Sequence, residues 1–217
     1  YKVTTDNATP FYNIFGGTQD NNSMGGPSAT NNAAGILNSD WYITNGGDGF
    51  ESATDWSNNN IVYAQAQHGW LVRYDKASGE KVPIQPMPGK GEEAYRWNWD
   101  APLIVSSHDA STLYFAANKL FKSTNKGDDW QVISPDLSQQ IDRNKLEVMD
   151  QVWTIDAVMK NASTTIYGNV IALDESPKKK GLLYVGTDDG LIQVSENDGG
   201  TWTKYSTFLG VPANTRV

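Results

Sequence analysis

Two stretches of the sequence decide the fold: Ser123-Thr124-Asn125-Lys126-Gly127-Asp128-Asp129-Trp130 and Ser195-Glu196-Asn197-Asp198-Gly199-Gly200-Thr201-Trp202. Both follow the pattern Ser-x-Asn-x-Gly-x-x-Trp. Serine and asparagine side chains hydrogen-bond the amides of a tight turn, glycine accepts a positive φ, and tryptophan supplies a large apolar side chain to a core. The pattern therefore predicts the same turn twice, at equivalent places of an internal repeat.

Short strand-like segments surround these turns in a constant order. Each copy has a strand with tyrosine at its third position, namely Ile61–Ala64, Thr112–Phe115 and Leu182–Val185. A second strand follows it (Trp70–Arg73, Leu120–Lys122 or Leu191–Val194), and a last strand follows the next turn (Lys81–Ile84, Trp130–Ile133 or Trp202–Tyr205). In two copies an apolar strand also precedes, at Pro102–Val105 and Asn169–Ala172. This order predicts a four-stranded antiparallel meander, the blade of a β-propeller.

The copies divide the chain unevenly. Phe11–Gly17 parallels Leu183–Thr187, so we expect a fourth copy that is incomplete. The sequence begins with Tyr1 and lacks an export signal, which predicts that it is an excerpt of a longer protein. We therefore expect residues 1–217 to be a partial β-propeller of about four blades: 1–45 (partial), 46–97, 98–152 and 153–217. An insertion between Ser134 and Trp153 is expected to be a surface loop with one helical turn.

The composition supports an all-β class and excludes several functions. The chain has 20 glycines, 8 tryptophans and 10 tyrosines, which favour short strands and tight turns. Its net charge is −8, and its longest basic run is Lys178–Lys180, so nucleic acid is not an expected partner. It has no cysteine, which excludes disulfides and thiolate chemistry. No apolar run approaches the roughly 20 residues of a membrane span.

The turn pattern resembles the Asp box, with asparagine at the place where that motif usually has aspartate. The structural residues of the two boxes are Ser123, Asn125, Gly127, Trp130, Ser195, Asn197, Gly199 and Trp202. Further segments (Gly16–Asn21, Gly46–Phe50, Tyr95–Trp99 and Gly186–Gly190) make nearly the whole chain similar to the sortilin-like, BNR-repeat (Asp-box) propeller proteins of bacteria. Xyloglucanase-type and sialidase-type propellers are more distant resemblances.

This resemblance implies a segment of a larger exported protein that is secreted, periplasmic or at the cell surface. The Asp box itself is a folding device and does not specify an activity. Two functions therefore stay open: a non-catalytic scaffold that binds protein or glycan, and a glycoside hydrolase acting on polysaccharide. A structural subunit of a cell-surface assembly is a third. We expect the remaining blades, from the same polypeptide or a partner chain, to be its partners.

A glycosidase needs two carboxylates roughly 5–9 Å apart. The available acids are Asp20, Asp48, Asp100, Asp188 and Asp189. Asp48 is the preferred catalytic candidate, because the glycines on both sides of it let a substrate approach the backbone. The alternative role for Asp48 is to cap a turn.

Ligand-binding candidates are Arg96, Trp97 and Trp99, whose side chains can stack on a ligand or pack within a blade. The four arginines (Arg73, Arg96, Arg143 and Arg216) match no sialidase motif. The two histidines, His68 and His108, lack the spacing of a metal site. We therefore expect neither a metal nor a cofactor.

Overall fold

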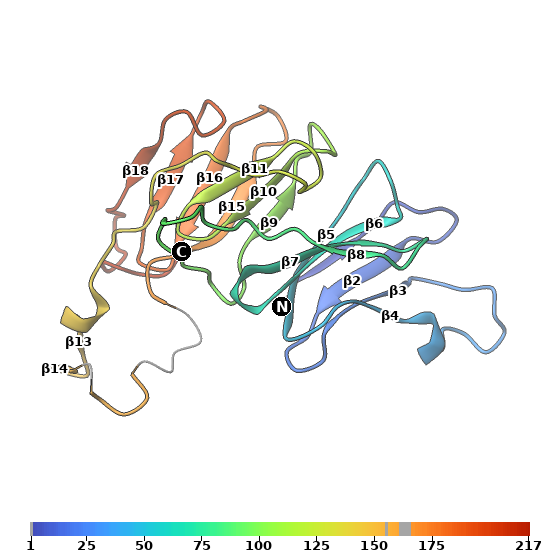
Figure 1. Ribbon diagram of the computed structural model, residues 1–217, viewed down its shortest axis with the longest axis horizontal. Helices are drawn as coiled ribbons and strands as arrows, with labels where there is room; N and C mark the ends of the chain where they lie inside the picture. The colour runs from blue at the N-terminus through green and yellow to red at the C-terminus, as the bar shows by residue number, and fades with distance from the viewer. Residues whose placement is uncertain (1, 155, 161–165) are drawn as a thin grey trace.

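The computed structural model describes residues 2–154, 156–160 and 166–217 (Figure 1). Its main strands form four antiparallel sheets in which strand order follows chain order. Sheet 1 holds β1 (Val3–Thr5), β2 (Asn13–Gly17), β3 (Ser23–Pro27) and β4 (Tyr42–Asn45); sheet 2 holds β5 (Gly49–Thr54), β6 (Ile61–Ala66), β7 (Trp70–Asp75) and β8 (Lys81–Pro83). Sheet 3 holds β9 (Leu103–Val105), β10 (Leu113–Ala116), β11 (Leu120–Ser123) and β12 (Gln131–Val132); sheet 4 holds β15 (Val170–Glu175), β16 (Leu183–Thr187), β17 (Ile192–Ser195) and β18 (Thr203–Tyr205).

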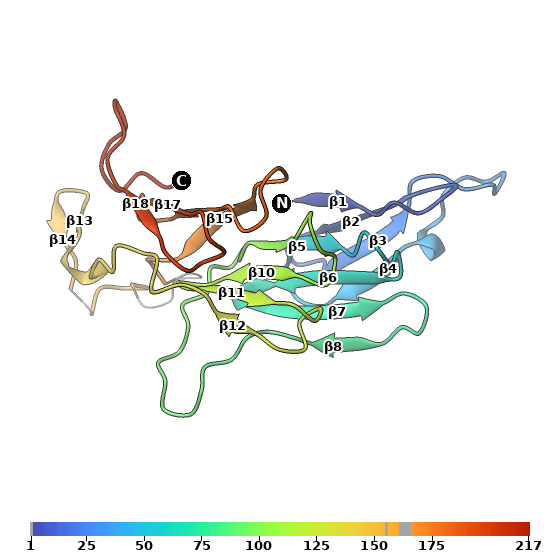
Figure 2. The ribbon, with the colours of Figure 1, turned by 90° about the horizontal axis from the view of Figure 1, so that it is seen from above.

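The sheets follow one another as successive blades, from the blue end to the red end of the chain (Figures 1 and 2). Their first strands lie next to each other, β1 against β5, β5 against β9 and β9 against β15. This arrangement places the first strand of each sheet innermost. The prediction of an all-β fold built from four-stranded propeller blades is confirmed.

The expectation that the first copy is incomplete was wrong, because sheet 1 has four strands. Its strands β3 and β4 read Ser-Met-Gly-Gly-Pro and Tyr-Ile-Thr-Asn, which lack the apolar character by which the other strands were found. The strand β5, Gly-Phe-Glu-Ser-Ala-Thr, was missed for the same reason. Pairing with apolar neighbours, not the intrinsic preference of these residues, makes them strands.

The insertion before sheet 4 contains more structure than a loop with one helical turn. The 3₁₀ turn η1 (Asn38–Asp40) connects β3 to β4 and η2 (Gln67–Gly69) connects β6 to β7, whereas η3 (Arg143–Lys145) lies in the insertion. A two-stranded hairpin of β13 (Glu147–Val148) and β14 (Gln151–Val152) follows η3. In Figure 1 this hairpin projects away from the four sheets. Among the described residues, no helix is long and apolar enough to cross a membrane.

The two Ser-x-Asn-x-Gly-x-x-Trp turns have matching hydrogen bonds. The Ser123 Oγ accepts a bond from the Gly127 amide at 2.8 Å, and the Ser195 Oγ accepts one from the Gly199 amide at 2.8 Å. Gly127 and Gly199 have φ values of 91° and 87°, which explains the requirement for glycine. These bonds are those that the sequence pattern predicted.

Each of these turns is packed against the sheet that precedes its own. The Trp130 indole donates to the Ile84 carbonyl at 2.6 Å, and the Trp202 indole donates to the Ile133 carbonyl at 3.2 Å. The turn glycine lies over the same isoleucine, with no room for a Cβ at Gly127. One pattern therefore forms a turn and joins two blades.

The apolar cores also lie between sheets. One joins sheets 2 and 3 and includes Tyr63, Leu71 and Phe115. The other joins sheets 3 and 4 and includes Tyr114 and Leu183. Each of these cores is formed by two neighbouring sheets together, as expected for repeated units that share their cores.

Ion pairs connect the sheets at their rims. Lys76 contacts Asp6 at 2.8 Å and Lys126 contacts Asp55 at 2.6 Å, and both carboxylates are buried. Burial would by itself raise the pKa of Asp55, but hydrogen bonds from Lys126 and from the Ser57 side chain and amide hold it below its ordinary value. The Asp55 carboxylate is therefore charged in the folded protein.

We expect Trp130→Ala to lower the free energy of unfolding by about 3 kcal/mol, because it removes the interblade packing and the bond to Ile84. Denaturant unfolding followed by circular dichroism measures this loss. Trp70→Ala is the matched control, since the Trp70 side chain is exposed and lies outside the turn. Equal losses in both variants would show that the turn tryptophan has no special role.

We expect Asp55→Asn to destabilise the protein by about 2 kcal/mol at pH 7, because Lys126 loses a charged acceptor. The pKa of Asp55 is lowered in the folded state, so its contribution is present above about pH 4 and is lost as the pH falls through the lowered pKa. The difference from the wild type should therefore shrink in acid. Glu93→Gln, at an exposed position, is the control; a pH-independent difference would contradict the assignment.

Candidate functional site

The meander topology separates the connections of each blade onto two ends of the propeller. Turns that join the first strand to the second, and the third to the fourth, lie at one end, which we call the turn end. Turns between the second and third strands, and the links from sheet to sheet, lie at the opposite end, which we call the linker end. Both Ser-x-Asn-x-Gly-x-x-Trp turns are at the turn end. The candidate site residues (Asp20, Asp48, His68, Arg96, Trp97, Trp99, Asp100, Asp188 and Asp189) are all at the linker end.

The preferred catalytic candidate, Asp48, links two turns. Its Oδ1 accepts a hydrogen bond from the Asp20 amide at 2.7 Å, and its own amide donates to the Gln67 Oε1 at 2.8 Å. Asp48 is not among the residues that line the cavity described below. Its contacts are those of a turn-capping residue, the alternative that the sequence left open.

Arg96 holds two linkers together. Its guanidinium donates to Asp136 at 2.7 Å, to the Ser138 Oγ at 3.0 Å and to the Gly168 carbonyl at 3.1 Å. Burial by itself would raise the pKa of Asp136, but hydrogen bonds from Ser138, Asn118 and Arg96 hold this pKa below its ordinary value. Arg96 therefore positions the chain before sheets 3 and 4.

Trp97 and Trp99 have different surroundings although only Asn98 separates them. The Trp97 ring stacks on Phe115 and on Phe121, with centroids 4.7 and 5.6 Å away, so it belongs to the core. Trp99 instead faces the linker end, where its indole donates to the His68 Nε2 at 2.9 Å. Of the three binding candidates, Trp99 lines the cavity described next, whereas Arg96 and Trp97 do not.

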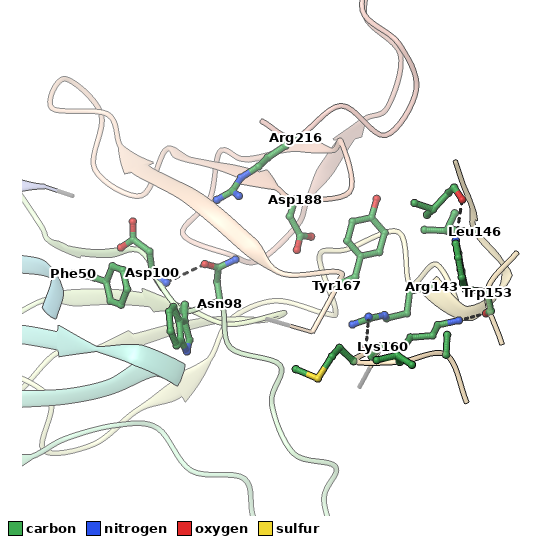
Figure 3. A pocket seen from close by; sticks show the side chains of 15 residues that line it. Phe50, Asn98, Asp100, Arg143, Leu146, Trp153, Lys160, Tyr167, Asp188 and Arg216 are labelled. Carbon is green, nitrogen blue, oxygen red and sulfur yellow. Dashed lines mark hydrogen bonds between the residues drawn. The ribbon is translucent and has the colours of Figure 1, made fainter. Parts of the chain in front are cut away.

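The cavity at the linker end has a volume of about 880 Å³ (Figure 3). It is lined mainly by apolar and aromatic side chains, with two carboxylates, one amide and three cationic groups among them. The lining residues are Phe50, Asn98, Trp99, Asp100, Arg143, Leu146, Val148, Trp153, Ala157, Val158, Met159, Lys160, Tyr167, Asp188 and Arg216. A large, mostly apolar cavity with a few polar groups is typical of a ligand site.

The inner wall of this cavity consists of residues at or just before the first strands of several blades. Phe50 lies in β5, the segment Asn98–Asp100 precedes β9, and Tyr167 precedes β15. Asp188 comes from the turn between β16 and β17. Side chains from three sheets therefore meet at one place because their first strands surround a common axis.

Two carboxylates face this cavity in different environments. Burial raises the pKa of Asp188 above its ordinary value, and the charge of Asp189 adds to this effect, against hydrogen bonds from the Asn169 and Gly168 amides at 2.8 and 3.0 Å. The Asp100 Oδ1 is buried and has no hydrogen-bond partner among the described residues. In Figure 3 the two side chains lie on either side of Asn98.

The outer wall of the cavity is the insertion before sheet 4. Arg143 donates to the Lys160 carbonyl at 2.7 Å, Lys160 contacts the Trp153 carbonyl, and the Trp153 indole donates to the Val148 carbonyl at 3.0 Å. These contacts hold the insertion as a unit and place the Trp153 ring against the cavity. The cationic groups of Arg143 and Lys160 are thus occupied by backbone acceptors.

No group of three or more metal-binding side chains lies together in the part of the chain that the structure describes. His68 accepts the bond from Trp99, and the His108 Nε2 is 2.9 Å from the Ser176 carbonyl. Both histidines therefore have structural contacts.

Sequence reasoning missed Phe50, Asn98, Trp153, Tyr167 and Arg216 as site residues. Asn98 and Tyr167 share a signal, since each stands one to five residues before an innermost strand. That position could have identified both residues as site candidates, because propeller topology brings the segments that precede the innermost strands to one end of the molecule. Trp153 gave no such signal, because its place depends on how the insertion folds back.

No family model matches the chain, and no curated protein matches it in sequence. Among solved structures it is similar to the GH74 xyloglucanase from Xanthomonas campestris, with a TM-score of 0.54 and 16% identity over 91% of this chain and 28% of that one. It is also similar to the GH74 enzyme from Niastella koreensis, with a TM-score of 0.49 and 21% identity over 79% of this chain and 23% of that one.

A third similar structure is the extracellular domain of a protein assigned to a hybrid two-component system of B. thetaiotaomicron, with a TM-score of 0.49 and 15% identity over 93% of this chain and 22% of that one. The chain thus spans less than a third of each of these proteins. At such identities the likeness to the xyloglucanase shows the fold alone. The resemblance to bacterial propeller proteins is confirmed at that level.

Proposed function

We propose that the chain is a non-catalytic propeller segment of an exported protein that binds a glycan in the linker-end cavity. The observation that carries this proposal is the convergence of aromatic side chains from separate segments, Phe50, Trp99, Trp153 and Tyr167, on a cavity that also holds carboxylate and amide groups. Sugar rings offer apolar C–H faces to aromatic rings and hydroxyl groups to polar side chains. The exported location rests on the resemblance of the turn pattern.

The dimensions and polarity of the cavity support a glycan over a flat protein partner. A cavity of about 880 Å³ encloses a ligand of several sugar units or a similar small molecule, within the usual range for such sites. Asn98 and Asp100 add an amide and a carboxylate to the mostly aromatic and apolar lining of this cavity.

We expect Trp153→Ala to weaken glycan binding about fivefold, since one aromatic contact contributes roughly 1 kcal/mol. Isothermal titration calorimetry against a panel of soluble plant and microbial polysaccharides measures the affinity. Trp56→Ala is the matched control, because Trp56 is similarly exposed but lies at the turn end. If no polysaccharide binds the wild type, or if both variants bind alike, the cavity is not the glycan site.

A glycoside hydrolase is the second candidate, favoured by one observation. Asp100 and Asp188 face the same cavity, and burial raises the pKa of Asp188. A carboxyl group that keeps its proton to higher pH can act as a general acid, and a second carboxylate can act as base or nucleophile. Asp188 would be the acid and Asp100 the second group.

If the protein cleaves a glycan, Asp188→Asn and Asp100→Asn should each abolish release of reducing sugar. Cleavage by the wild type should fall as the pH rises through the raised pKa of Asp188, because the acid must be protonated. Asp48→Asn separates this pair from the earlier candidate: loss of activity in that variant alone would place catalysis at Asp48. Binding without any release across the panel would exclude hydrolysis and leave the scaffold.

A further inference from the structure

The turn between β6 and β7 places a histidine beside the cavity residue Trp99. Residues 67–70 close this turn with a backbone hydrogen bond from the last amide to the first carbonyl. His68 has a φ of 60° and Gly69 a φ of 74°, so both central residues are left-handed, as in a type I′ hairpin turn. The Trp97 ring lies over Gly69 and leaves no room for a Cβ there. The turn is therefore packed against the segment that carries Trp99.

The first central position of this turn holds His68, where asparagine, aspartate or glycine is usual. A left-handed backbone strains most other side chains. The His68 ring makes a specific contact from this position: the Trp99 indole donates to its Nε2 at 2.9 Å, and the two ring centroids lie 6.0 Å apart in an edge-to-face arrangement. Asparagine would suit the backbone, but its shorter side chain ends at the place of Nδ1 and does not reach Trp99.

Sheet 2 holds Trp99 at three points. The Gln65 Nε2 donates to the Trp99 carbonyl at 2.9 Å and fixes the backbone. The Phe50 ring lies against the indole, with centroids 5.9 Å apart, and the bond to His68 fixes the edge that carries the N–H group. Trp99 lines the cavity, whereas His68 is not among the lining residues. His68 therefore acts on the cavity through the orientation of Trp99.

The bond to Trp99 forms in one protonation state of His68. An indole N–H donates and does not accept, so Nε2 must present its lone pair and the ring proton must be on Nδ1. A second proton goes to Nε2 and makes both ring nitrogens donors, so two N–H groups face each other and the bond is lost. Histidine is the side chain that typically changes its charge between pH 5 and 8. Because His68 is exposed, solvent protons reach it.

We propose, building on the glycan binding proposed above, that His68 is a positioning residue for the linker-end cavity. Uncharged His68 holds the Trp99 ring in the cavity wall, and protonated His68 releases it, so that ligand affinity falls in acid. Other charged groups lie on the elements around this pair and the cavity, namely Asp48, Glu51, Arg96, Asp100, Asp188 and Arg216. The test must therefore remove the titration of His68 alone.

Two substitutions separate the hydrogen bond from the backbone of the turn. His68→Gln places an uncharged acceptor oxygen at the place of Nε2 at every pH, whereas His68→Asn favours the left-handed backbone but is too short to accept from Trp99. Circular dichroism checks that both variants fold. Since both keep a polar side chain in the same turn, their difference reports the bond to Trp99.

The first measurement needs no ligand. NMR follows the Trp99 indole N–H, assigned with Trp99→Phe, and the His68 ring protons of the wild type between pH 8 and pH 5. We expect the indole resonance to shift together with the protonation of His68, and to stay constant in His68→Gln. An indole resonance that does not respond while His68 gains its proton would overturn the proposal, and this result uses the wild-type chain alone.

The second measurement is calorimetry at pH 8 and pH 5 with xyloglucan, galactomannan and laminarin, which are neutral and do not titrate. We expect the wild type to bind about threefold more weakly at pH 5, as for the loss of one hydrogen bond. His68→Gln should keep the pH 8 affinity at both values, and His68→Asn should bind weakly at both. An equal pH dependence in the wild type and His68→Gln would overturn the role of His68. Absence of binding at either pH would instead count against the glycan site, while the NMR titration decides the role of His68 separately.

Discussion

The structure depends on the contact between the tryptophan of one blade and the end of the last strand in the preceding blade. A four-stranded sheet has two faces, and no blade of this chain buries both faces by itself. Trp130 and Trp202 help to bury these faces, because each belongs to a turn of its own sheet and packs on an isoleucine of the preceding sheet. The turn glycine allows the close approach, and the cores with Tyr63 and Tyr114 then fill the space between sheets.

This way of joining blades leaves the linker end free for a ligand. The interblade tryptophans and the ion pairs of Asp6 and Asp55 are at the turn end, so stability and ligand contact use different surfaces. The linker end combines one residue or short segment from each of several blades with the insertion before sheet 4. A change in that insertion can therefore alter the cavity without altering the blades.

Much of the fold was predictable from the residues, but the site was predictable only in part. The strands with tyrosine at their third position and the strands after the two turns lie where the pattern placed them, because apolar alternation and turn chemistry are local. The strands β1, β3, β4 and β5 were missed, since Gly, Thr, Ser and Asn become strand residues there through pairing. Asp48 was preferred for its glycine neighbours, yet it bonds the Asp20 turn and lies outside the cavity.

The sequence by itself determined the repeated unit of this protein: four short strands, a turn that needs glycine, and a tryptophan that enters a core. The strand pattern and the turn follow from interactions within about ten residues, whereas the contacts of Trp130 and Trp202 with the preceding blade join residues far apart in the chain. Only the tertiary structure decided which side chains share the cavity, because Phe50, Trp99, Trp153 and Asp188 meet through the radial order of the sheets and the path of the insertion. It also decided that Trp97 belongs to the core and Trp99 to the cavity, since stacking on Phe115 and Phe121 is a contact between distant segments.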